Sequence, residues 1–298
     1  MRALLDRFLP VDLRRRIAQW RHAPAWLRAS RAKNETSIVL DKHVLDELSA
    51  TFEEPPPYGY DPEAVRRRGD IRARELMDLH GGSIRPDDRR SLELGCYDGM
   101  VSACLTERGF VAWTTDLSAK GFDPRLGPAG VKRVVTDGEA LPFPDGYFDL
   151  VFSYDVLEHL RDPEQVLREA ARVLRPGGLI YFASGPLYPS PYGLHALRAT
   201  PVPYCQFLFS EEVMREVEVN GPGPFPWVNG WSIRDYRRLW KRLEDVLVLV
   251  RSREGLIWEF CDVIAKYPGC FREGIGGHTG FNLEDLTTPS VKVLFRRR

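Results

Sequence analysis

Three acidic side chains, Glu93, Asp116 and Asp137, stand within or directly after short apolar segments of the chain. If each segment is a strand of one parallel sheet, these carboxylates lie side by side at its carboxyl edge, where open α/β sheets bind their ligands. Asp116 lies 23 residues after Glu93, a spacing typical of an acid that accepts hydrogen bonds from ribose hydroxyls. The set therefore predicts a site for a nucleoside.

The turn beside Glu93 restricts which nucleoside is expected. Residues 91–99, Ser-Leu-Glu-Leu-Gly-Cys-Tyr-Asp-Gly, predict a buried strand and a tight turn, and residues 100–108 predict a helix that ends at Gly109. A dinucleotide-binding turn of the form Gly-x-Gly-x-x-Gly would have glycine at positions 97 and 100, where this chain has Tyr97 and Met100. The strand carboxylate would repel a phosphate but suits a cationic amino-acid group. We expect a nucleoside with a positively charged tail, and an NAD-linked oxidoreductase is disfavoured.

The rest of the chain alternates between apolar segments and helical patterns. This alternation predicts a Rossmann-like, doubly wound α/β fold with a mostly parallel seven-stranded sheet, whose last two strands form an antiparallel edge. The pattern leaves residues 258–277 unassigned. Beyond the first strand and helix, strands are expected at 111–116, 131–136, 149–154, 179–183, 246–250 and 291–295, and helices at 62–80, 163–174, 210–219 and 232–242.

Composition is that of an ordinary globular protein. The 298 residues include 42 Lys and Arg against 42 Asp and Glu, so no global charge favours nucleic acid, and no nucleic-acid partner is expected. The five cysteines are odd in number and form no Cys-x-x-Cys pair, which favours a reducing, cytoplasmic compartment. We expect no signal peptide and no membrane-spanning segment.

Three regions of different character are expected. Residues 1–33 combine arginines with apolar residues at helical spacing, so they either lie peripherally on an anionic membrane or dock on the protein itself or a partner. With the acidic, proline-rich linker that follows, residues 1–57 are interpreted as an appendage dispensable for the core fold. Residues 58–298 form the main domain, and 185–231 form an inserted lid over the strand ends.

These motifs together resemble the class I S-adenosylmethionine-dependent methyltransferases, in particular the group that includes ubiquinone-pathway methyltransferases. The resemblance covers residues 61–295 and is densest from 91 to 183. The matching stretches are Leu-Glu-Leu-Gly-Cys-Tyr-Asp-Gly at 92–99, Asp-Leu-Ser at 116–118, Asp-Gly-Glu-Ala-Leu-Pro-Phe at 137–143, Phe-Asp-Leu-Val at 148–151, Val-Leu-Glu-His-Leu at 156–160 and Leu-Arg-Pro-Gly-Gly at 174–178.

The resemblance implies S-adenosylmethionine as cofactor and assigns roles to individual residues. Glu93 would orient the methionine amino group, Asp116 would accept both ribose hydroxyls, and Asp137 would meet the adenine amino group, with the Gly138 amide at the ring. The full set of implied cofactor residues is Glu93, Gly95, Cys96, Tyr97, Gly99, Asp116, Leu117, Asp137, Gly138, Glu139, Ser153 and Tyr154. Tyr97 departs from the family, which usually has its middle glycine there. Its side chain would narrow the turn or shield the methionine end of the site.

The acceptor is expected to be a hydroxyl, and two residues are candidates for the base that removes its proton. Asp155 follows the fourth strand, where it would either act as base or cap the next helix. His195 lies in the lid among tyrosines and prolines that either line a substrate wall or belong to the core. His159 is expected to pack behind the cofactor. No tight cluster of metal ligands is evident, so no metal is expected.

Several acceptors stay open. The lid segment 186–209 weakly resembles methyltransferases of glycan and surface-polysaccharide assembly, which favours a small-molecule or glycan hydroxyl. A quinone or lipid phenol would suit the amphipathic N-terminus, and an amine would need no base. A non-catalytic protein that keeps the fold and binds a partner is the remaining alternative. The sequence predicts no oligomeric state.

Overall fold

The computed structural model describes residues 13, 38–53, 59–80, 89–220, 224–272 and 280–298. Apart from Leu13, the basic N-terminal element predicted at 1–33 lies outside these residues. The chain divides into two compact units. The first unit comprises residues 1–57, 185–236 and 253–291, and the second comprises 58–184, 237–252 and 292–298. Within the described residues, no helix is both long enough and apolar enough to cross a membrane.

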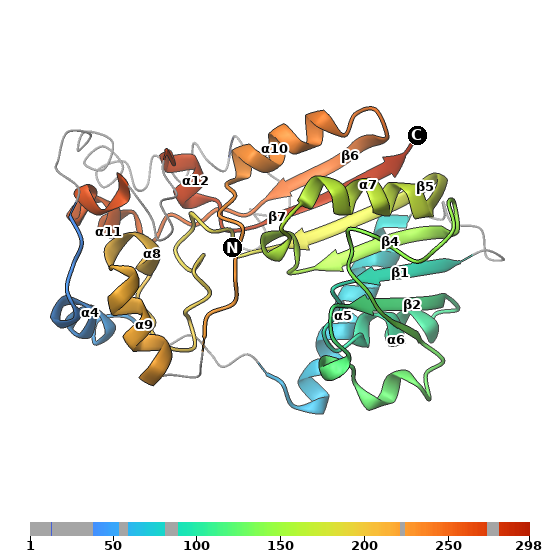
Figure 1. The fold of residues 1–298 in the computed structure, drawn as a ribbon, viewed down its shortest axis with the longest axis horizontal. Coiled ribbons are helices and arrows are strands. Elements are labelled where there is room, and N and C mark those ends of the chain that lie inside the picture. Colours follow the sequence, from blue (N-terminus) through green and yellow to red (C-terminus); the bar gives the residue numbers. More distant parts are fainter. Residues whose placement is uncertain (1–12, 14–37, 54–58, 81–88, 221–223, 273–279) are drawn as a thin grey trace. The chain divides into compact units, whose positions relative to one another are not determined.

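The second unit contains a seven-stranded sheet in the order β3-β2-β1-β4-β5-β7-β6. Adjacent strands from β3 to β5 are parallel, and in Figure 1 the arrow of β7 points opposite to those of β5 and β6. The mostly parallel, doubly wound sheet predicted from the sequence is confirmed. The strands are β1 Arg90–Leu94, β2 Val111–Asp116, β3 Lys132–Val135, β4 Phe148–Tyr154, β5 Leu174–Ser184, β6 Leu247–Glu254 and β7 Val291–Arg297.

Helices cover both faces of this sheet. Helices α5 (Pro62–His80) and α6 (Met100–Thr106) share a buried core with Phe152 of β4 and Leu294 of β7. Phe295 follows Leu294 and so points to the opposite face, where its ring lies 5.2 Å from that of Trp240. Trp240 belongs to α10 (Ile233–Arg242), which the Arg242–Glu164 ion pair joins to α7 (Pro163–Val173). A sheet buried on both faces explains why all seven residues of β4 are buried.

The first unit has its own hydrophobic core, built by helices that the sequence only partly predicts. Helix α9 (Glu211–Asn220) begins after Ser210, whose hydroxyl accepts a hydrogen bond from the Val213 amide as expected of a cap. Helices α4 (Lys42–Ser49), α11 (Cys261–Lys266) and α12 (Leu283–Thr287) were not predicted, and α8 (Cys205–Leu208) lies in the region interpreted as lid.

Two expectations need correction. The helix predicted at 163–174 ends at Val173, and β5 starts directly at Leu174, so Arg-Pro-Gly-Gly at 175–178 lies in the strand and not in a turn before it. Residues 38–53 are not a detachable appendage. Leu45 and Leu48 of α4 are buried with Phe207 in the core of the first unit, and the Leu40 amide donates to the Leu208 carbonyl at 2.8 Å. A chain that begins at residue 58 would lose these apolar side chains.

All five cysteines are buried free thiols. Burial raises the pKa of each of them, to about 12 for Cys205 and Cys261 and to about 11 for Cys270. The other two, Cys96 and Cys104, are shifted in the same direction for the same reason. The thiols are therefore packed as small apolar side chains and kept protonated.

Candidate functional site

The turn between β1 and α6 adopts a conformation that requires glycine at two points. Gly95 and Gly99 have φ of 61° and 70°, in the left-handed region. A Cβ atom on Gly95 would lie 2.6 Å from Cγ2 of Val156, and one on Gly99 would lie 2.8 Å from Cδ1 of Leu126. The backbone is therefore packed closely on one side of the turn and leaves room there for hydrogen alone. Both glycines that the sequence assigns to the donor site are thus needed for the packing of the turn itself.

Glu93 lies beneath this turn and not at its surface. Its side chain is 3% exposed, and Oε2 accepts hydrogen bonds from the amide of Ser102 at 3.1 Å and from its hydroxyl at 2.6 Å. Burial raises the pKa of Glu93 to about 8, against an ordinary value of 4.5, because the ionised form loses its hydration. The carboxyl group thus joins β1 to α6. A role in orienting an amino group would act through the turn that it supports, and it stays a prediction.

Asp116 ends β2 and joins the glycine turn to the segment that follows the strand. Its Oδ2 accepts a hydrogen bond from the Tyr97 amide at 2.9 Å, and its Oδ1 accepts one from the Ser118 amide at 3.3 Å. The next side chain, Leu117, is 73% exposed. In a nucleoside site, the carboxylate would bind the ribose hydroxyls, and the exposed apolar side chain after it would pack on the face of the base. The sequence places both Asp116 and Leu117 in the cofactor site, and their contacts with a ligand stay a prediction.

Asp137 lies at the same edge of the sheet, one strand further out. In the register of β2 and β3, Asp116 faces Val135, so Asp137 follows two residues beyond that pair. Its side chain is exposed, and Oδ1 accepts a hydrogen bond from the Glu139 amide at 3.0 Å. The Glu139 carbonyl accepts one from the Gln165 side chain at 3.1 Å. The structure therefore brings Asp116, Asp137 and the glycine turn to one edge, as expected.

Ser153 and Tyr154 differ from the other predicted cofactor residues because the fold uses their side chains. The Ser153 hydroxyl donates to the Leu94 carbonyl at 2.7 Å and joins β4 to β1. The Tyr154 hydroxyl donates to the Arg72 carbonyl at 3.1 Å, and the ring is 8% exposed. Contact with a ligand at these two positions would have to come from the main chain.

Asp155 directly follows β4 and adopts the left-handed conformation, with φ of 56°. Its amide donates to the Ala183 carbonyl at 2.7 Å, and its carboxylate pairs with the guanidinium of Arg72. The short helix η4 (Leu157–His159) begins after Val156 without a side-chain cap, so Asp155 does not cap it. Arg72 is a residue that sequence reasoning missed, because 83 positions separate it from its partner.

His195 belongs to the first unit. It also has a left-handed backbone, with φ of 59°, and its Nε2 lies 3.0 Å from the Pro186 carbonyl oxygen. A carbonyl can only accept, so Nε2 carries a hydrogen and Nδ1 is the basic nitrogen of the neutral ring. Tyr188, considered for a substrate wall, is 3% exposed and packs against Phe207, so it is a core residue.

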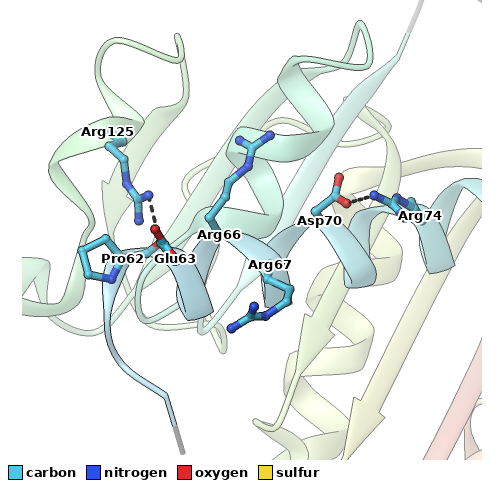
Figure 2. Close-up of a pocket in the computed structure, with 7 residues that line it drawn as sticks. All are labelled: Pro62, Glu63, Arg66, Arg67, Asp70, Arg74 and Arg125. Carbon is cyan, nitrogen blue, oxygen red and sulfur yellow. Dashed lines mark hydrogen bonds and ion pairs between the residues drawn. The ribbon is translucent and has the colours of Figure 1, made fainter.

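A hollow of about 620 Å³ lies along α5. Figure 2 shows the arginine side chains that extend along it. Three of its guanidinium groups are paired with carboxylates, in the pairs Arg66–Glu107, Arg74–Asp70 and Arg125–Asp123. None of its seven lining residues belongs to the predicted cofactor set. Its walls carry both signs of charge, so it does not define a ligand. The lining residues are Pro62, Glu63, Arg66, Arg67, Asp70, Arg74 and Arg125.

Comparison with known proteins agrees with the geometry of the sheet edge. Residues 92–182 match the family model of a methyltransferase domain. A 27-O-demethylrifamycin SV methyltransferase of Amycolatopsis mediterranei is 34% identical over 159 residues, which cover 51% of this chain and 53% of the relative. A ubiquinone biosynthesis O-methyltransferase of Parvibaculum lavamentivorans is 31% identical over 121 residues, covering 37% and 48%.

A third relative matches over a longer stretch. A fatty-acid O-methyltransferase of Mycolicibacterium smegmatis is 29% identical over 214 residues, which cover 69% of this chain and 74% of the relative. The chain spans about half the length of the first two relatives. The matched domain contains the glycine turn and all three strand-end acids. Residues 92–182 thus form a methyltransferase domain, carried by a sheet of the order β3-β2-β1-β4-β5-β7-β6.

Proposed function

We propose that this protein transfers a methyl group from S-adenosylmethionine to an oxygen atom, most simply the hydroxyl of a small molecule or a glycan. One observation carries the proposal. At the edge of the sheet, the Asp116 carboxylate binds the backbone of a turn whose conformation and packing require Gly95 and Gly99. A carboxylate beside such a turn suits a ribose, and the exposed Leu117 and Asp137 suit a base beside it.

The names of the relatives support oxygen as the acceptor atom. All three proteins compared above are named for the methylation of oxygen or of an O-demethyl compound. Their acceptors differ, so they do not select one for this chain. A phenol of a quinone or lipid is the first alternative to a small-molecule or glycan hydroxyl, and an amine is the second.

The proposed reaction assigns separate tasks to the chain's own residues. When bound, S-adenosylmethionine supplies a methyl group on a cationic sulfur, which an oxygen nucleophile displaces in line. The carbon–sulfur bond breaks, a carbon–oxygen bond forms, and the hydroxyl proton must go to a base. We assign that proton to one of the two predicted bases, His195 or Asp155. The remaining catalysis comes from holding the two reactants in line.

The test measures donor binding and methyl transfer separately. Calorimetry with S-adenosylhomocysteine is expected to show saturable binding at micromolar concentrations. Transfer of a labelled methyl group is then screened over nucleotide sugars, glycans, phenols, fatty acids and amines. Product with a hydroxyl acceptor supports the proposal. Binding without transfer to any acceptor would favour a non-catalytic binding protein, and thermal protection by NAD in place of the nucleoside would contradict the donor assignment.

A further inference from the structure

Tyr97 combines two features that are unfavourable in the isolated protein. Its φ is 51°, a left-handed conformation that is strained for a residue with a side chain. Its side chain is also 60% exposed, although it is large and mostly apolar. A glycine at this position would carry neither the backbone strain nor the exposed ring. The neighbouring Gly95 and Gly99 adopt the same left-handed region. The conformation of the turn therefore does not explain why a tyrosine stands at position 97.

The surroundings hold this ring in a defined place next to the proposed ribose site. The Tyr97 amide donates to Oδ2 of Asp116 at 2.9 Å, which fixes the backbone beside that carboxylate. The ring itself lies against the segment that follows β2, because a Cβ atom on Gly121 would be 2.9 Å from Cδ2 of Tyr97. The tyrosine thus spans from the glycine turn to the segment after Asp116, the two loops that flank the proposed donor.

A second aromatic residue, Tyr60, packs against Tyr97. The ring of Tyr60 meets it edge to face, with 6.4 Å between the ring centres and 73° between the planes. Tyr60 is anchored through its neighbour, since Arg68 donates from Nη1 to the Gly59 carbonyl and from Nη2 to Oδ2 of Asp98, both at 3.0 Å. Tyr60 is itself 47% exposed. Two tyrosines thus present partly exposed ring surface at the turn.

We propose that Tyr97, braced by Tyr60, is a specificity-determining residue of the donor site, whose ring covers the ribose end of the bound nucleoside. This inference rests on the proposed function, since it takes S-adenosylmethionine as the donor. Burial of the ring against the ligand offsets the strain and the exposure that the free protein carries. The alternative is that the ring has a purely structural role and only joins the turn to the segment after β2. The two interpretations predict opposite effects of glycine on fold stability.

The experiment replaces Tyr97 with glycine and measures two quantities on the full chain. The dissociation constant for S-adenosylhomocysteine, measured by calorimetry, is expected to rise about tenfold in Tyr97→Gly, the effect of losing one aromatic contact. The melting temperature without ligand is expected to stay unchanged or to rise, because the backbone strain is relieved. Tyr97→Phe is expected to bind as the wild type does, and Tyr60→Ala is expected to bind more weakly.

The matched control is Val111→Ala, which removes an exposed apolar side chain at the amino end of β2, where 47% of the residue is accessible. It is expected to leave the dissociation constant unchanged. If Tyr97→Gly does not fold, Tyr97→Asn replaces it, since asparagine tolerates the left-handed region and also lacks the ring.

The outcomes separate this inference from the proposed function. Unchanged affinity in Tyr97→Gly, with normal binding by the wild type, would overturn the inference and leave the proposed function intact. A lower melting temperature of the glycine variant without ligand would show that the ring has a structural role. That result would also overturn the inference. No binding by the wild type would overturn the proposed function and this inference together.

Discussion

The guanidinium of Arg72 pairs with the Asp155 carboxylate and lies 4.5 Å from the centre of the Tyr154 ring. Helix α5 thereby holds the residue that follows β4, and the Tyr154 hydroxyl returns a hydrogen bond to the Arg72 carbonyl. Of the two base candidates that the sequence offers, Asp155 is thus the one held by an arginine.

His195→Ala is expected to lower turnover by about 10²–10⁴-fold, the usual contribution of a positioned base. Affinity for S-adenosylhomocysteine is expected to stay unchanged, because the histidine acts on the acceptor. Asp155→Asn is expected to lower turnover less than tenfold. His43→Ala, which removes an exposed histidine on α4, is the control and is expected to have no effect. An equal loss in both test variants would instead make Asp155 part of the proton transfer.

Asp116→Ala is expected to weaken binding of S-adenosylhomocysteine by about 1–3 kcal/mol, the scale of a lost hydrogen bond to a charged group. The Tyr97 amide would lose its acceptor in the same variant, so part of the effect comes from the turn. Calorimetry measures the affinity directly. The matched control is Asp145→Ala, an acid whose side chain is 74% exposed and which precedes β4 at the opposite edge of the sheet. Equal affinity in both variants would remove Asp116 from the donor site.

Gly95→Ala is expected to lower the free energy of unfolding by at least about 1–2 kcal/mol, because alanine is strained at this φ. The added Cβ would also lie 2.6 Å from Val156, so the turn must shift and donor affinity should fall with it. Gly127→Ala is the control. Its φ is −60°, and no atom lies within 4 Å of the added carbon, so stability should change by less than about 1 kcal/mol. Urea unfolding compares the two variants.

The raised pKa of Glu93, about 8 against an ordinary 4.5, predicts a pH dependence of stability. Between these values the folded protein holds a proton that the unfolded chain has released, so raising the pH favours unfolding. The stabilising contribution is fully present below the ordinary pKa and is lost as the pH rises through about 8.

Glu93→Gln removes this titration and keeps an acceptor for Ser102. Relative to the variant, the wild type is expected to lose up to about 1.4 kcal/mol of unfolding free energy per pH unit across this window. Urea unfolding from pH 5 to pH 9 measures the difference between the two proteins. If the free energies of unfolding of the wild type and the variant change in parallel with pH, Glu93 titrates at its ordinary value in the folded state.

The sequence predicts the sheet edge well because the signals there are local. The strand around Glu93, the glycine turn and the acid at the end of β2 each depend on a few consecutive residues. Tertiary contacts are different. The brace of Tyr60 on Tyr97 and the pair of Arg72 with Asp155 join residues far apart in the chain, and neither has a local signature.

The first unit was predicted least well, for a related reason. Helix α4 has eight residues and α12 has five, too short for a helical period to be evident among loops rich in proline and glycine. The apolar side chains of α4 are buried by segments more than a hundred residues away, such as that around Phe207. The strand start at Leu174 was missed because Pro176 and two glycines are typical of a turn.

The five buried thiols make the protein well suited to site-specific labelling. Maleimides react with the thiolate form of accessible cysteines, and here every native thiol is both buried and held protonated. A single cysteine introduced at the exposed position of Leu117 would carry a fluorophore next to Asp116 without prior removal of the native ones. Its emission would then report occupancy of the sheet edge in solution, in real time and with the whole chain intact.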